Sequence, residues 1–249
     1  MISLKSKREI QLLRDAGKIV AETHALIKEA IRPGISTLEL DEIAYRNITK
    51  YDAIPSFLNY NGFPKSICTS KNDIIVHGIP SEEDILLEGD IISVDIGAYY
   101  KGYHGDSAKT HGVGTISDED SRLIAVTRES FYEGIRHAVI GNRLSDISHH
   151  VQKVAEEAGY SVVREFVGHG VGTKLHEDPS VPNYGPPNRG PRLAEGLVIA
   201  VEPMINQGTY HVRIEDDGWT VRTQDSKKSA HYEHTIAITE HGPELLTLL

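Results

Sequence analysis

The sequence contains only one cysteine, Cys68, among its 249 residues. A single cysteine can form neither a disulfide within the chain nor a zinc site built from several thiolates. No apolar run approaches the roughly 20 residues that a transmembrane helix requires, and the opening residues MISLKSKREI lack the apolar core of a signal peptide. We therefore expect no membrane partner and a cytoplasmic location.

An excess of positive charge is also missing. The chain carries 26 Lys and Arg against 36 Asp and Glu, a net charge of -10, which argues against nonspecific nucleic-acid binding but leaves a local basic patch open. Hydrophobic residues make up 39% and charged residues 25%, as in globular proteins rather than disordered ones. The length fits one large domain or two small fused ones, and no linker or low-complexity segment divides it.

Periodicity and turn residues predict an α+β chain. Apolar residues recur at steps of three and four from Ile10 to Ile31, which predicts a first helix that Pro33 and Gly34 end. Ser36 and Glu39 fit a capping box for a second helix. Further helices are expected over 117–138 and 144–158. Strands are expected in GDIISVDIGAYY and GYHGDSAKTHGVG, which form a hairpin that turns near Lys101 and Gly102, and in YSVVREFVGHG, LVIAVEPMI, TYHVRIED, WTVRT and HYEHTIAIT.

The two halves of the chain repeat one pattern. LEGDIISVD, which ends at Asp95, aligns without a gap on AEGLVIAVE, which ends at Glu202. The turn glycines Gly34 and Gly141 differ by the same offset of 107 residues. Two matches at one offset favour an internal duplication, with halves of about 1–110 and 111–249 in one domain over 1–249. Asp95 and Glu202 are then counterparts at the ends of equivalent strands.

The hairpin brings two acidic residues together. With a turn centred between Tyr100 and Lys101, Asp95 faces Asp106, and directly opposed residues have Cβ atoms roughly 4.5–5.5 Å apart. Two carboxylates at that distance repel each other unless one keeps a proton or a cation neutralises both. The alternative is that one or both side chains face solvent in a loop, and the hairpin alone leaves these readings open.

Three further residues favour the cation. His169 lies between glycines in VGHGVG, Glu202 ends an apolar strand in AVEPM, and Glu233 begins one in HYEHTIAI. Each alone is compatible with a satisfied core residue or a solvated strand end. Together with the two aspartates they form an oxygen-rich set with one imidazole, which suits manganese, iron or cobalt. We therefore hypothesise a carboxylate-bridged pair of ions, roughly 3.5–4 Å apart, that activates a water.

The ordered motifs NDIIVHGIP, GDIISVDIG, GYHGDSAKT, VVREFVGHGVGTKLHEDP, AVEPMIN, DGWTVRTQD and AHYEHTIAIT span nearly the whole chain. In this set the chain resembles the bacterial type I methionine aminopeptidases. The resemblance implies the pita-bread fold, a curved antiparallel sheet covered by two helix pairs with a pseudo-twofold axis. It implies metal-dependent removal of the initiator methionine, preferring a small second residue, by a water or hydroxide that bridges the metals.

The resemblance also assigns the metal centre. Two divalent ions, such as cobalt, manganese or iron, would be held by Asp95, Asp106, His169, Glu202 and Glu233. Asp106 and Glu233 would bridge them, Asp95 would complete one site, and His169 with Glu202 would complete the other. Glu202 would also act as the general base and then the general acid.

Other residues would contact the substrate. By resemblance, His176 would steady the carbonyl oxygen in the tetrahedral intermediate, and His77 would contact the scissile amide or the adjacent backbone. The methionine would enter an apolar pocket in which Cys68 is a wall and not a nucleophile, and whose lining would be Phe57, Tyr60, Phe63, Cys68, Leu175 and Trp219. A monovalent cation would be held largely by backbone carbonyls at Asn72, Ile74 and Ser229.

The same resemblance describes the partners. The N-termini of nascent polypeptides would be the substrates, and no specific nucleic-acid binding is expected. Contact with the ribosome would follow from such substrates, although no motif indicates it, and the usual state of the family is a monomer. Only 26 positions separate His176 from Glu202, which leaves no room for the helical insertion of type II enzymes.

Two rival functions stay open. A prolidase or an aminopeptidase P would share the five ligands, but these enzymes lack the combination of Cys68 before HGIP and Trp219 in DGWTV. They also carry a separate N-terminal domain, which we do not expect here. A binding module of the same fold without catalysis typically loses ligands, whereas all five are present in this sequence.

Overall fold

The computed structural model describes all 249 residues, which form four α-helices and fifteen strands. The helices are α1 (Lys7–Ala30), α2 (Thr37–Thr49), α3 (Asp118–Ile135) and α4 (Leu144–Glu157). The four predicted helices are therefore confirmed to within a few residues. None of them combines the length and the apolarity needed to cross a membrane.

Local capping explains where α2 begins. The backbone N–H of Glu39 donates to Ser36 Oγ at 3.1 Å, and the N–H of Ser36 donates to Glu39 Oε2 at 2.9 Å. These reciprocal bonds satisfy two donors that the first helical turn leaves free. The predicted capping box is therefore confirmed.

The strands form four antiparallel sheets. One contains β1 (Ile54–Pro55), β4 (Ile91–Tyr100), β2 (Ile67–Lys71) and β5 (Tyr103–Gly112), and another has the order β15-β14-β9-β7-β8. The strands of the latter are β15 (Gly242–Leu245), β14 (His234–Thr239), β9 (Val198–Val201), β7 (Gly168–Gly170) and β8 (Glu177–Val181). The two smaller sheets contain β13 (Ser229–His231), β10 (Met204–Asn206) and β6 (Ser161–Val162), and β11 (Val212–Ile214), β12 (Val221–Thr223) and β3 (Ile74–Val76).

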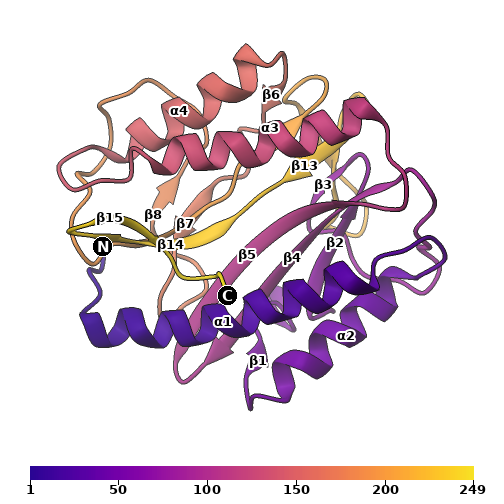
Figure 1. Cartoon of the computed structure of the whole chain (residues 1–249), viewed down its shortest axis with the longest axis horizontal. Coiled ribbons are helices and arrows are strands. Elements are labelled where there is room, and N and C mark those ends of the chain that lie inside the picture. Colours follow the sequence, from indigo (N-terminus) through magenta and orange to yellow (C-terminus); the bar gives the residue numbers. More distant parts are fainter.

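Two pairs of helices cover the strands. Figure 1 shows α1 with α2 on one side of the view and α3 with α4 on the other, with the strands between and behind them. Along β4 the side chains alternate, and one set is buried in a core cluster with α1 and α2: Ile92, Val94, Ile96 and Ala98. Each large apolar side chain in such a core contributes about 1.5–3 kcal/mol. Asp95 lies in the other set and therefore points to the opposite face, away from the helices.

The register of the central hairpin differs from the prediction. Asp95 is paired with Ala108, and Asp106 with Gly97, so the predicted direct opposition of Asp95 and Asp106 is wrong. The turn consists of Lys101 and Gly102, which both have positive φ, 48° and 90°, as a tight two-residue hairpin turn requires. With this turn, the partner of Asp95 is Ala108, which lies two positions beyond the predicted partner Asp106. The two aspartates still share one face, as diagonal neighbours whose side chains can meet.

Three predicted strands are each broken in two. The segment 160–170 contains β6 and β7, the segment 197–205 contains β9 and the start of β10, and the segment 231–239 contains the end of β13 and all of β14. Glu202 lies in the break after β9, where Pro203 follows and cannot donate to the ladder. Glu233 lies in the break before β14. The predicted positions of both acids at strand ends are confirmed, and the breaks let their side chains leave the regular pleat.

The halves repeat backbone contacts at an offset of 107 residues. The turn glycines Gly34 and Gly141 have φ of 90° and 94°, in the left-handed region that favours glycine. The repeated contacts are the bridge of Ser36 with Ile85 and that of Arg143 with Arg192, and the hydrogen bonds from Gly34 N to Leu86 O and from Gly141 N to Leu193 O. These pairs support the duplication, while the division near residue 110 stays a prediction.

Candidate active site

One cavity of about 330 Å³ gathers the predicted site. Its 18 lining residues include all five predicted metal ligands, both predicted catalytic histidines and all six predicted pocket residues. Sequence reasoning missed five lining residues: Asn61, Val76, Phe166, Val167 and Met204. All five lie within three positions of a predicted site residue, so adjacency to the motifs was the available signal.

The five predicted ligands come from both large sheets. Asp95 lies on β4, Asp106 on β5 and His169 on β7, while Glu202 follows β9 and Glu233 precedes β14. His169 Nε2 is 3.7 Å from Asp106 Oδ2 and 3.6 Å from Glu202 Oε1. Donor atoms of Asp106, His169 and Glu233 all lie within 4.8 Å of one another. Residues spread over 139 positions of sequence therefore converge on one small volume.

The conformation of His169 leaves one ring nitrogen free. Its Nδ1 lies 2.9 Å from the carbonyl oxygen of Gly170, so the Nδ1–H donates there and Nε2 faces the acids. Burial lowers the pKa of His169 to about 3, which keeps the ring neutral, as metal ligation requires. The flanking glycines allow close strand packing: a Cβ at Gly168 would lie 2.3 Å from the carbonyl oxygen of Ala200.

The four carboxyl groups lie close together and perturb one another. Asp106 is 3% exposed and Glu233 2% exposed, so the solvent-facing alternative is excluded for both, while Asp95 and Glu202 are half-buried. Burial raises the pKa of Asp95 to about 7 and that of Glu202 to about 8. Burial, reinforced by the neighbouring carboxylates, raises the pKa of Asp106 and of Glu233 well above the ordinary range.

These residues fit a divalent cation. Asp95 Oδ1, Asp106 Oδ1 and Glu233 Oε1 are buried oxygens with no hydrogen-bond partner. An unsatisfied buried polar group costs about 1–3 kcal/mol, and more when it is charged. A divalent ion would accept all three oxygens as ligands and neutralise the repulsion among the carboxylates. The donor set consists of four carboxylates and one neutral imidazole, which are oxygen and nitrogen ligands for a divalent cation, and it contains no thiolate.

The family of the chain follows from this centre and from its sequence. Residues 11–240 match metallopeptidase family M24. The chain belongs to this family. Membership in M24 confirms a metallopeptidase and supports the use of divalent metal by the buried acids.

Two M24 relatives match nearly end to end. Methionine aminopeptidase 1 of Bacillus subtilis is 58% identical over 247 residues, which are 99% of each chain. The crystal structure of methionine aminopeptidase from Thermotoga maritima has a TM-score of 0.98 at 42% identity and covers 100% of both chains. These matches confirm the resemblance to the bacterial type I enzymes and the pita-bread fold.

A prolidase matches less closely. The prolidase from Pyrococcus furiosus has a TM-score of 0.76 at 23% identity, and the match covers 99% of this chain but 65% of that one. That likeness shows the shared fold and nothing further. The fold alone does not separate the aminopeptidase from its rival, but the 58% identity to the Bacillus subtilis methionine aminopeptidase over 99% of both chains does.

The predicted pocket forms an apolar wall beside the acids. Phe57, Phe63, Cys68 and Leu175 form one buried cluster against which Tyr60 and Trp219 pack. The rings of Phe63 and Trp219 meet edge to face, with centroids 5.3 Å apart. Cys68 on β2 is paired with Asp95 on β4, which joins the pocket directly to the acidic centre. Burial raises the pKa of the Cys68 thiol, so it stays protonated and is a poor nucleophile.

The two predicted catalytic histidines flank the centre. The rings of His176 and His169 have centroids 4.1 Å apart, and His176 Nδ1 lies 2.7 Å from the hydroxyl oxygen of Tyr60. With the hydroxyl as donor, the proton of His176 is on Nε2, where it is free to donate. His77 meets Phe166 and Trp219 edge to face, at 5.5 and 6.4 Å between centroids. Burial lowers the pKa of both histidines, that of His77 to about 4.

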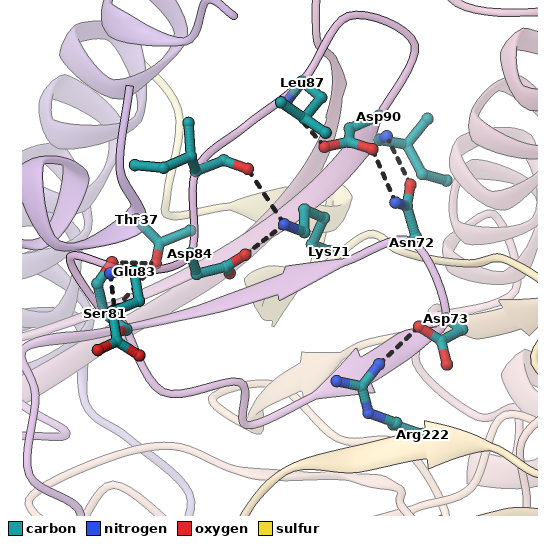
Figure 2. Close-up of polar contacts among 12 residues, drawn as sticks. Thr37, Lys71, Asn72, Asp73, Ser81, Glu83, Asp84, Leu87, Asp90 and Arg222 are labelled. Atoms are coloured by element: carbon teal, nitrogen blue, oxygen red, sulfur yellow. Dashed lines mark hydrogen bonds and ion pairs between the residues drawn. The ribbon is translucent and has the colours of Figure 1, made fainter. Parts of the chain in front are cut away.

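The predicted monovalent-cation residues lie outside the cavity. The N–H of Ser229 donates to the carbonyl oxygen of Asn72 at 2.9 Å, and Ile74 begins the neighbouring strand β3. Figure 2 shows the Asn72 amide directed at Asp90, to which its Nδ2 donates at 2.8 Å. This bond holds the bend before β3. The role of the three residues in holding a cation stays a prediction.

Proposed function

We propose that this enzyme removes the initiator methionine from the N-termini of new proteins and peptides. One observation carries the proposal: a buried centre of four carboxylates and an imidazole shares its cavity with an aromatic, apolar pocket. The pocket has the chemistry to hold an unbranched thioether side chain. The acids have the chemistry to hold metal at the adjacent peptide bond.

Asp95, Asp106, His169, Glu202 and Glu233 would together hold two divalent ions, of cobalt, manganese or iron, in the proposed centre. When bound, the ions supply a Lewis acid that polarises the peptide carbonyl and lowers the pKa of water. The three unpartnered carboxylate oxygens described above support this assignment.

The residues of the chain then move one proton and stabilise one charge. Glu202 takes a proton from the attacking water and delivers it to the nitrogen of the leaving amine. The Nε2–H of His176 donates to the carbonyl oxygen as negative charge develops there. His77 contacts the scissile amide or the backbone beside it. The ring contacts of His77 and the hydrogen bond of His176 hold both groups in position before substrate arrives.

The setting of the reaction is part of the proposal. A cytoplasmic monomer would act on nascent N-termini whose second residue is small, with no specific nucleic-acid binding, and contact with the ribosome would bring it to that substrate. A monovalent cation at Asn72, Ile74 and Ser229 would tie β3 to β13. The resemblance supports these points, together with the acidic charge and the single cysteine of the sequence.

The first test compares two peptides. Metal-stripped enzyme is reconstituted anaerobically with manganese, iron(II) or cobalt and given Met-Ala-Ser and Ala-Pro-Ser separately. We expect methionine to be released from the first and no cleavage of the second. Cleavage of Ala-Pro-Ser alone would assign the chain to the proline-directed branch of the fold. Cleavage of neither, with metal measured in the protein, would contradict a peptidase function.

Substitution of His176 tests the oxyanion role. We expect His176→Ala to lower kcat about 10²–10³-fold, because one preorganised donor to the developing charge is lost. Bound metal, measured in the same samples, should change little. His241→Ala is the matched control, since the side chain of His241 is 88% exposed. Loss of metal with unchanged turnover per bound ion would instead make His176 a structural support of the centre.

A further inference from the structure

His231 lies in the metal centre, although the sequence motifs give it no role. It ends β13, is 1% exposed, and is paired with Met204 on β10. Thr110 on β5 fixes its backbone from the other side: the N–H of His231 donates to Thr110 Oγ1, and that hydroxyl donates to the carbonyl oxygen of His231, both at 2.9 Å. Two strands therefore hold this residue rigidly against the carboxylates.

The imidazole of His231 points a free nitrogen at Glu202. Its Nε2 is buried without a hydrogen-bond partner and lies 3.6 Å from Glu202 Oε2. The other oxygen of the same carboxylate, Oε1, lies 3.6 Å from His169 Nε2. Glu202 thus lies between two imidazoles at equal distances. His169 is a predicted metal ligand, and His231 has the same relation to the acid.

These separations fall within the range that the ligands of a common ion span. A gap of 3.6 Å between nitrogen and oxygen is too long for a good hydrogen bond. Ligands bound at about 2.1 Å lie about 3 Å apart when adjacent and about 4.2 Å apart when opposite. Donor atoms of Glu202, His231 and Glu233 all lie within 4.8 Å of one another. His231 Nε2 has no hydrogen-bond partner, and an ion bound within this group would give that nitrogen the partner it lacks.

We propose that His231 Nε2 is a further protein ligand in the metal centre, on an ion shared with Glu202 and Glu233. The inference rests on the metal centre of the proposed function and adds a second imidazole to it. A second nitrogen ligand makes the centre softer than five residues with one imidazole. It therefore favours iron(II) and cobalt over manganese more strongly than the sequence motifs imply.

Counting ligating histidines tests this directly. In cobalt(II)-loaded protein, each ligating histidine contributes one hyperfine-shifted ring N–H proton signal, which disappears when the solvent is exchanged to heavy water. We expect two such signals in the wild type. We expect one in His231→Gln, whose amide preserves polarity but is a weaker ligand. Loss of a residue that only orients a ligand costs about 10–100-fold in metal affinity, so loss of a direct ligand should lower the cobalt affinity of this variant, measured by titration calorimetry, by at least about 10-fold.

The matched control is His111→Gln. His111 also has a buried Nε2 without a partner, but it is paired with Ile92, whose side chain belongs to the core beneath α1 and α2, and it belongs to neither group of donors that could hold an ion. This variant should keep both N–H signals and the wild-type cobalt affinity. Circular dichroism verifies that each variant is folded before it is loaded.

The number of shifted N–H signals in the wild type tests whether His231 is a ligand even if a variant fails to fold. One shifted N–H signal in the wild type overturns the proposal, as does a cobalt affinity in folded His231→Gln equal to that of the wild type. Methionine release is measured on the same loaded samples. Two N–H signals without methionine release would refute the proposed function while leaving His231 as a ligand.

Discussion

The Glu202→Gln enzyme is expected to lose at least about 10³-fold of its methionine release. General acid–base catalysis alone contributes about 10²–10⁴-fold, and this substitution also removes a carboxylate from the metal centre. Glutamine has a similar shape but cannot take a proton from water and return it to the amine.

The measurement pairs turnover with metal content. Steady-state release from Met-Ala-Ser is divided by the ions found in each sample, so lost binding and lost chemistry are separated. Glu195→Gln, an exposed acid seven positions earlier, should behave as the wild type. Glu202→Asp keeps a carboxyl group, but the side chain is shorter and holds that group farther from the metal and the water. We therefore expect intermediate activity. Near-normal turnover per ion in Glu202→Gln would refute the assigned proton transfer.

Removal of the metal is the second large effect. We expect a chelator to abolish turnover, because no other electrophile in the cavity can polarise the carbonyl and activate water together. Restoring manganese, iron(II) or cobalt anaerobically should restore it. Turnover that persists in protein shown to be free of metal would exclude the metal-dependent mechanism.

The stability of the metal-free protein should then depend on pH in a characteristic direction. The pKa of Asp95 is raised to about 7 and that of Glu202 to about 8, against about 4 for unfolded carboxyls. The folded protein therefore binds more protons between these values. The stabilising contribution of these groups is fully present below about pH 4 and is lost as the pH rises through 7 to 8.

Bound metal should reverse this trend. Metal holds the carboxylates deprotonated, so protons compete with it and its affinity rises with pH. At one fixed metal concentration, we expect the Tm difference between loaded and metal-free protein to widen from pH 5 to pH 8 and to reach about 5–10 °C at pH 8, if that concentration is a hundredfold above the Kd at pH 8. Asp106→Asn provides the control: without metal it should be more stable than the wild type at pH 8, and it should gain little from metal. A Tm difference between loaded and metal-free protein that does not change with pH would contradict the competition between protons and metal.

The sequence by itself determined the local structure and the inventory of the site. Helix boundaries depend on nearby residues, so the capping box at Ser36 and Glu39 and the apolar spacing from Ile10 onward were sufficient to predict them. The offset between Asp95 and Glu202 revealed the duplication, because both halves preserve the same turn and strand. The ordered motifs identified the acids and histidines that line the cavity, which the repeat alone could not have done.

Only the tertiary structure decided how these groups meet. The register of the hairpin depends on the turn at Lys101 and Gly102 and on packing across the sheet, so Asp95 and Asp106 became diagonal neighbours and not an opposed pair. The strand breaks at Glu202 and Glu233 lie where the chain passes between the five-stranded sheet and the sheet of β6, β10 and β13. His231 is one of 13 histidines, and nothing local distinguishes it. Its burial and free Nε2 result from β5 and β10 closing around it, contacts between segments distant in sequence.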